Sequence, residues 1–117
     1  MSLTGYVYYT AHIDVLLSQP SLSQLFYDKM KSEIATLMSW VTVQDSRPVT
    51  GLGNEAYIVF GTRSESSEAY LLVIDGNAEI DIQYEVSSIG RQAQAASESQ
   101  SEAAVLAMSH DVIRNLS

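Results

Sequence analysis

The chain has 117 residues and a mass of 12.8 kDa, which favours a single domain spanning residues 1–117. Hydrophobic residues make up 46% of it, enough for one core, and six Lys and Arg against fourteen Asp and Glu leave a net charge of −8. That charge disfavours nucleic acids and anionic membrane surfaces as partners. The sequence contains no cysteine, which excludes disulfides, thiolate metal sites and cysteine nucleophiles.

No apolar run reaches the roughly 20 residues of a membrane span, and no signal-peptide pattern opens the sequence. Residues 1–3 are compatible with a short added leader in front of a domain excised from a longer protein. On that interpretation, a signal or lipid anchor would lie upstream of residue 1.

The first part of the chain predicts a strand followed by a helix. Residues 4–15 alternate in polarity as a half-buried strand does. One face carries Val7, Tyr9, Ala11 and Ile13, and the other carries Tyr6, Tyr8, Thr10, His12 and Asp14. Residues 20–38 predict an amphipathic helix, with Pro20 in its first turn and Ser21 and Gln24 as a capping box. Its expected apolar stripe is Leu22, Leu25, Phe26, Met30, Ile34, Leu37 and Met38, with Tyr27 off the stripe.

Further strands and a second helix are expected downstream. Strands are predicted at 40–44, 55–62, 69–74 and 78–86, separated by a loop at 45–54, a polar turn at 63–68 and a tight turn at 75–77. Residues 69–74 are apolar on both faces, which is typical of a central strand covered on both sides. A loose connection at 87–102 includes a second capping box, Ser99 with Glu102. The final helix has a predicted stripe of Val105, Met108, Val112 and Leu116.

The order of these elements, β-α-β-β-β-β-α, indicates an α+β fold. Consecutive strands joined by short turns favour an antiparallel sheet of about five strands. We expect the two helices to pack on one face of that sheet. The pattern leaves the strand order open, because several orders satisfy it.

The run from Gly51 to Ala56 resembles the start of a dinucleotide-binding loop. A strand follows it where that motif requires a helix, so no helix N-terminus would face a phosphate. We therefore interpret Gly51, Gly53, Asn54 and Gly76 as structural turn residues and expect no cofactor.

Carboxylates gather on one face of the 78–86 strand. Glu79, Asp81 and Glu85 share that face, and Asp75 lies near its start. Such groups can share a proton or bind calcium, but a solvated sheet face or a charge-guarded edge is the more ordinary interpretation. His110 lies far from His12 in sequence and neither has metal-ligand spacing, so no metal site is expected.

Tyr6, Tyr8 and His12 are the candidate ligand-binding residues. Exposed aromatic side chains on a strand can form a recognition surface. The competing and favoured interpretation is that a second layer, such as the C-terminal helix, covers these tyrosines. His12 also pairs with Asp14 at i, i+2, which leaves a catalytic use of the two open.

Three pieces of the sequence together resemble a known family. They are residues 49–57 (VTGLGNEAY), residues 71–84 (LLVIDGNAEIDIQY) and residues 102–116 (EAAVLAMSHDVIRNL). In that order they are similar to actinobacterial extracytoplasmic lipoprotein domains of the family called domain of unknown function 3558, with receptor-kinase sensor domains as looser relatives. The resemblance implies a domain of the cell envelope, tethered through an upstream lipid, with no established reaction. The chain departs from the family pattern in lacking paired cysteines and in having Asn54 where Asp is common.

Three functions remain open from the sequence. The leading hypothesis is a non-enzymatic binding or sensor module of a bacterial envelope lipoprotein, whose partner is a small molecule or an envelope protein. It would use either the Tyr6, Tyr8 and His12 face or a groove between helix and sheet. The second is a small α+β hydrolase or isomerase with His12 as base and Asp14 as its orienting group. The third is a structural homodimer, with a sheet edge or the tyrosine face as the seam. A cytoplasmic location also stays open.

Overall fold

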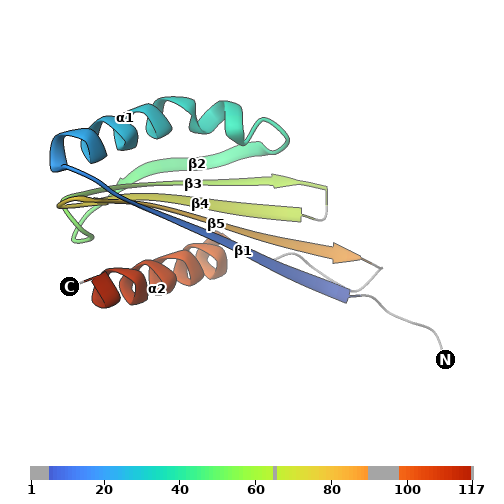
Figure 1. Cartoon of the computed structure of the whole chain (residues 1–117). Helices are drawn as coiled ribbons and strands as arrows, with labels where there is room; N and C mark the ends of the chain where they lie inside the picture. The colour runs from blue at the N-terminus through green and yellow to red at the C-terminus, as the bar shows by residue number, and fades with distance from the viewer. Residues whose placement is uncertain (1–5, 65, 90–97, 117) are drawn as a thin grey trace.

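The computed structural model describes residues 6–64, 66–89 and 98–116. Its five strands are β1 (Tyr6–Leu17), β2 (Thr42–Val49), β3 (Glu55–Arg63), β4 (Ser66–Asp75) and β5 (Ala78–Ile89), and its helices are α1 (Pro20–Leu37) and α2 (Glu98–Leu116). The strands form one antiparallel sheet in the order β1-β5-β4-β3-β2 (Figure 1). The predicted α+β fold, with five antiparallel strands and two helices, is confirmed. Residues 1–3 and 90–97, half of the predicted loose connection, lie outside the described residues. The other half is not loose, because β5 runs to Ile89 and α2 begins at Glu98.

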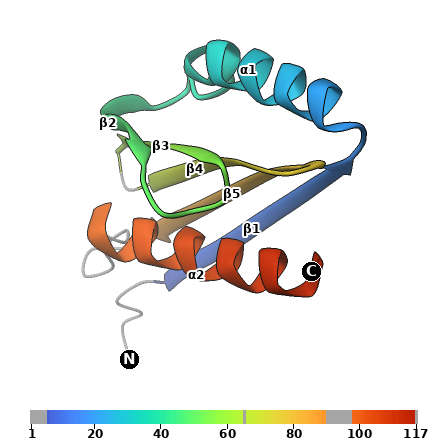
Figure 2. The same cartoon turned by 90° about the vertical axis from the view of Figure 1, so that its left-hand side faces the viewer.

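The expectation that both helices pack on one face of the sheet is wrong. α1 lies on one face and α2 on the other, with the sheet between them (Figure 2). The physical reason is β4, whose side chains are buried on both faces: Leu71 and Val73 pack on the α2 side, and Leu72 and Ile74 on the α1 side. A central strand that is apolar on both faces needs a cover on each.

The topology follows from this two-sided cover. β2 to β5 form a meander, and β1 joins it beside β5. Because β1 and β2 lie at opposite edges of the sheet, the chain between them must cross a face, and α1 makes that crossing. The chain leaves β5 and returns as α2 on the other face.

The buried side of α1 differs from the predicted stripe. Tyr27, expected off the stripe, is fully buried, and Ser23, Ile34 and Met38 are buried on the same side. Of the predicted stripe, three residues instead have exposed side chains: Leu22, Leu25 and Phe26. The helix is rotated because Ser23 Oγ donates a hydrogen bond to the Asn77 carbonyl oxygen at 2.7 Å, which brings a small residue against the β4–β5 turn.

Several element boundaries also differ from the prediction. β2 runs through Pro48 to Val49, across much of the predicted 45–54 loop, with a register shift between Val43 and Asp45. Proline is tolerated there because β2 is an edge strand. β4 begins at Ser66, inside the predicted polar turn, and the capping boxes are not used as expected. The N-cap of α1 is Gln19 without a side-chain cap, and Ser99 lies within α2.

The loop before β3 is held against the β4–β5 turn. Gly51, Gly53 and Gly76 have φ of 77°, 59° and 60°, a region that favours glycine. The Asn54 backbone N–H donates to the Ile74 oxygen at 2.8 Å, and Asn54 Oδ1 accepts from the Gly76 N–H at 2.6 Å. These residues therefore tie the two turns together.

We predict that Gly53→Ala lowers the free energy of unfolding by about 2–4 kcal/mol, measured by urea denaturation. An added Cβ would lie 2.7 Å from the Ile74 oxygen and 2.9 Å from Val73 Cγ1. Gly51→Ala is the matched control, because it has the same sign of φ but open space around the added Cβ. It should lose only about 1 kcal/mol. Equal losses in the two variants would contradict the steric account.

Candidate functional site

The pairing of β1 with β5 brings two predicted groups of residues onto one surface. Opposite each other are Thr10 and Glu85, His12 and Gln83, and Asp14 and Asp81. Glu68 of β4 lies opposite Glu85, and its alternation with the buried Leu72 and Ile74 places this whole set on the α1 side of the sheet. We call it the acidic surface; its members are Glu68, Glu79, Asp81, Gln83 and Glu85 with Thr10, His12 and Asp14.

Part of the acidic surface is buried. The expectation of a solvated face or a guarded edge is wrong for Glu79, which is 3% exposed on a strand that lies inside the sheet. The cause is the contact of Ser23 with Asn77, which seats the first turns of α1 over the start of β5. Glu68 is fully buried as well. The sequence pattern predicts a polar turn at Glu68. The alternation of Glu68 with Tyr70 and Leu72 nevertheless indicates a strand position on the same face as these residues.

Burial perturbs the carboxyl groups. Removal from water is the main cause that raises the pKa of Glu79 from 4.5 to about 8, and a hydrogen bond to Asp81 and the charges of Asp81 and Asp14 raise it further. Burial also raises the pKa of Asp81, while the hydrogen bond from Glu79 opposes this. Near neutral pH Glu79 therefore holds a proton that it donates to Asp81. The nearby Tyr70 is affected too: burial and then the charges of Asp81 and Glu79 raise its pKa to about 12.

A second buried carboxyl group lies beside this pair. Gln83 Nε2 donates a hydrogen bond to Glu68 Oε1, and the Trp40 indole also hydrogen-bonds Glu68. Desolvation dominates and raises the pKa of Glu68. Two buried oxygens, Glu68 Oε2 and Asp81 Oδ1, have no hydrogen-bond partner among the described residues. Buried acceptors without partners are uncommon in native proteins, so these two oxygens mark a part of the sheet that lacks hydrogen-bond donors.

A shallow hollow of about 310 Å³ lies on the acidic surface. It is lined by Thr10, His12, Gln83 and Glu85. His12 Nε2 lies 2.9 Å from Asp14 Oδ2, with both side chains about two-thirds exposed. Of the predicted tyrosines, Tyr8 on the same face of β1 is 54% exposed, so the favoured expectation of a covering layer is wrong for it. α2 lies on the opposite face, and the side chain of Tyr6 is outside the described part of the structure.

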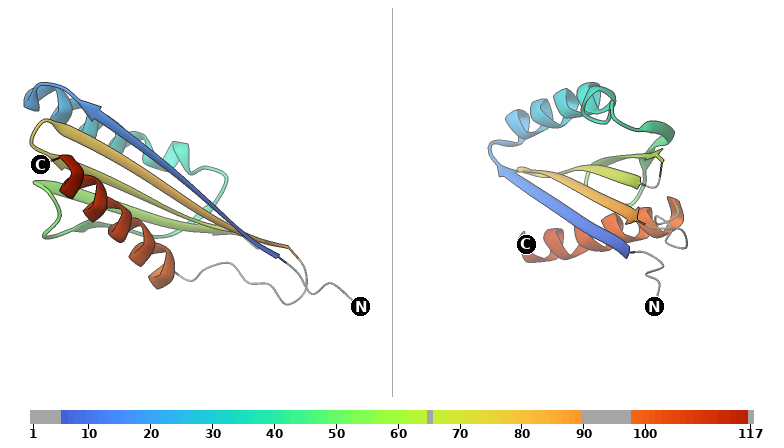
Figure 3. Two further views of the ribbon diagram at one scale, coloured as in Figure 1. Left: turned by 60° about the horizontal axis from the view of Figure 1, so that its bottom comes forward. Right: turned by 90° about the vertical axis from the view of Figure 1, so that its right-hand side faces the viewer.

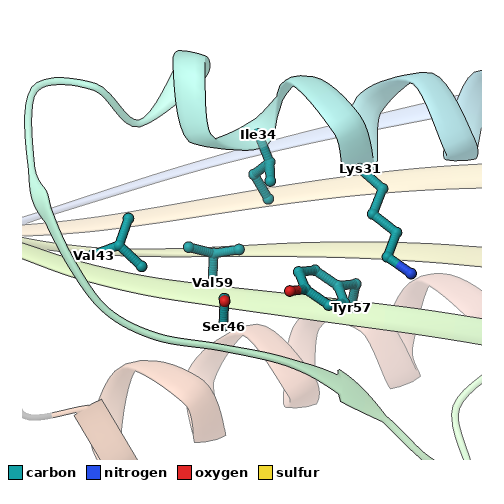
Figure 4. A pocket seen from close by; sticks show the side chains of 6 residues that line it. All are labelled: Lys31, Ile34, Val43, Ser46, Tyr57 and Val59. Atoms are coloured by element: carbon teal, nitrogen blue, oxygen red, sulfur yellow. The ribbon is translucent and has the colours of Figure 1, made fainter.

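A groove also exists between helix and sheet. It has a volume of about 230 Å³ and lies between α1 and strands β2 and β3 (Figure 4). Its lining is Lys31, Ile34, Val43, Ser46, Tyr57 and Val59. Lys31 Nζ lies 4.9 Å from the Tyr57 ring centroid and 3.8 Å from Glu55 Oε2, so its charge already has partners. The groove is mostly apolar and offers a ligand fewer charged groups than the acidic surface does.

Three carboxylates near the start of α2 come within 4.8 Å of one another: Asp45, Glu98 and Glu102. The Arg47 guanidinium contacts two of them, Asp45 at 3.1 Å and the buried Glu102 at 2.5 Å. The guanidinium of Arg47 therefore already pairs with this cluster. On the acidic surface, by contrast, the basic side chain that pairs with a carboxylate in the described part of the structure is His12.

No family model, curated protein or solved structure matches this chain. The resemblance drawn from the sequence therefore stays a prediction. Neither helix in the described part of the structure is long and apolar enough to cross a membrane.

We predict that the stability of the protein falls as pH rises from about 5 to 8 and that Glu79 causes much of the fall. In this range the folded state holds a proton on Glu79 that the unfolded chain has released, so the free energy of unfolding decreases with pH. The expected loss is on the order of 2 kcal/mol or more. Urea denaturation at pH 5 and pH 8 measures it.

Glu79→Gln should remove most of this pH dependence, because the amide keeps the shape of the protonated acid without its titration. Glu33→Gln, at an exposed position of α1, is the control and should keep the wild-type slope. If Glu79→Gln keeps that slope as well, the raised pKa is not the cause.

Proposed function

We propose that this chain is a non-enzymatic binding or sensor module that binds organic cations on its acidic surface. The class of ligand is one that carries ammonium groups, such as a polyamine or the lysine side chains of a peptide. The observation that carries the proposal is a hollow lined by Glu85 and by Gln83, which donates a hydrogen bond to the buried Glu68. On this surface no Lys or Arg of the described residues forms an ion pair with a carboxylate.

The chemistry of the hollow suits such a ligand. Carboxylate oxygens form short, charge-assisted hydrogen bonds with ammonium groups. Glu85 lines the hollow directly, and Gln83 connects it to the buried Glu68. The exposed ring of Tyr8 on the same face adds a cation–π partner.

The setting of this module is also a proposal. The likeness to actinobacterial envelope domains supports an extracytoplasmic location and an upstream lipid anchor. The net charge of −8 is consistent with a cationic ligand, because the whole field of the molecule attracts cations to its surface. In this setting the natural ligand is a soluble cation or a basic segment of an envelope protein.

We predict that spermidine raises the melting temperature of the protein at low ionic strength. A ligand at about 100 times its dissociation constant adds roughly 2.7 kcal/mol of stability, which is several degrees for a domain of this size. Glu85→Gln and Tyr8→Ala should each weaken the binding at least several-fold without unfolding the domain, since both residues lie on the sheet surface. Calorimetric titration gives the dissociation constants.

Asp111→Asn is the matched control, because it removes one charge from the exposed part of α2 on the opposite face of the sheet. It should leave spermidine binding unchanged. If Asp111→Asn and Glu85→Gln weaken binding equally, net charge alone explains the affinity, and the proposed binding site is wrong. An equal response to calcium at matched ionic strength would overturn the assignment to ammonium groups.

One contact favours a second candidate function, the small hydrolase or isomerase. His12 and Asp14 are within hydrogen-bond distance, as a base and its orienting carboxylate require, and His12 lines the hollow. This alternative predicts that the purified protein hydrolyses an activated ester such as p-nitrophenyl acetate. His12→Ala would then abolish the turnover, and Tyr8→Ala would only slow it. Absence of turnover above the buffer rate would remove this support.

A further inference from the structure

β1 is an edge strand built without the usual protections against pairing. In the described part of the chain it has one hydrogen-bonded neighbour, β5, and its other edge is open (Figure 3). Its twelve residues contain no Pro and no Lys, and its register with β5 is continuous over the whole strand. A long, regular edge of this kind is a template for another strand.

The side chains of β1 are also unusually apolar for an exposed edge. On its α2 side Tyr9, Ile13, Val15 and Leu17 are each between 41% and 64% exposed. α2 does not cover them, because its core partners come from β3, β4 and β5. On the α1 side Leu16 is exposed as well. Both faces of the edge thus present apolar surface that a neighbouring copy would remove from water.

The sequence of β1 is complementary to itself in one antiparallel register. Placing Ile13 on a two-fold axis sets His12 of each copy opposite Asp14 of the other. On the α2 side the same register sets Ala11 opposite Val15 and Tyr9 opposite Leu17. Hydrogen-bonding side chains and apolar residues in directly facing positions stabilise a strand pair.

The neighbouring registers lack this match. Moving the axis to His12 sets the two histidines opposite each other, and moving it to Asp14 sets two carboxylates opposite each other, which is destabilising. Moving it to Ala11 leaves Asp14 opposite Tyr8. The pairing of His12 with Asp14 therefore favours the register that is centred on Ile13.

We propose that two copies of this chain associate through β1 in antiparallel register about Ile13, so that the two sheets form one continuous sheet of ten strands. We assign the open edge to a second copy because, in this register, the residues of β1 match the facing residues of β1 in the other copy. In this dimer the two His12 and two Asp14 side chains form one polar cluster at the seam. The dimer does not require cation binding, and the tests below use no ligand.

The first test is the mass of the full chain in solution. Sedimentation velocity at micromolar to submillimolar concentrations should give twice 12.8 kDa, with dissociation on dilution. A species of 12.8 kDa throughout this range would overturn the proposal.

The second test is a cross-link in a chain that has no cysteine of its own. Facing residues of antiparallel strands have Cα atoms about 4.5–5.5 Å apart, within the range of a disulfide. Ile13→Cys should therefore form a disulfide-linked dimer rapidly under mild oxidation. Ala11→Cys should not, because the same residue of the other copy would lie four positions along the strand, roughly 13 Å away. Combining Ala11→Cys with Val15→Cys should restore rapid cross-linking.

The third test reverses the charges at the seam. In the His12→Asp variant, each of the two facing 12–14 pairs consists of two carboxylates. This repulsion should weaken dimerisation about tenfold. Adding Asp14→His exchanges the two charges and should restore the wild-type mass. Circular dichroism checks that each variant is folded. A dimer by mass with equal cross-linking rates for Ile13→Cys and Ala11→Cys would place the seam elsewhere and overturn the proposal, as would a charge reversal without effect.

Discussion

The burial of β4 on both faces is the constraint from which the rest of this structure follows. Leu71 and Val73 on one face, and Leu72 and Ile74 on the other, each need a covering layer. One helix is about 10 Å across, whereas a sheet of five strands is roughly 20 Å wide. A single helix on each face can therefore cover the centre of the sheet and not its margins. β1, at one edge of the sheet, lies in such an uncovered margin.

The same constraint explains why carboxyl groups are found under α1. β5 lies beside β4, and its Ile80 and Ile82 belong to the apolar core cluster that packs against α2. Its alternate residues, Glu79 and Asp81, face α1, which buries Glu79 and leaves Asp81 partly buried. Glu79 hydrogen-bonds Asp81 and lies near the charge of Asp14, and apolar side chains of similar volume in place of such buried ionisable groups are often neutral or stabilising.

The sequence predicted the elements well because their signals are local. Alternation in β1 and β5, the Pro20 start of α1 and the glycines around residue 53 each depend on a few neighbouring residues. The rotation of α1 was not predictable in this way, because the partners of its buried side are distant in sequence. Ser23 bonds Asn77 in the β4–β5 turn, and Tyr27 packs among residues of β3 and β4. The acidic surface had the same difficulty. His12 and the carboxylates were each noted, but only the register of β1 with β5 shows that they share a surface.

The placement of β1 beside β5 has a consequence for how the chain acquires its structure. More than 60 residues separate every pair of partners between these two strands, whereas β3, β4 and β5 are joined by short turns. Closing a long loop costs more entropy than closing a short one, so the hairpins form first. During synthesis β1 emerges before the strand it pairs with, and it waits until nearly the whole domain has been made. We therefore expect β1 to be the last strand to join the sheet.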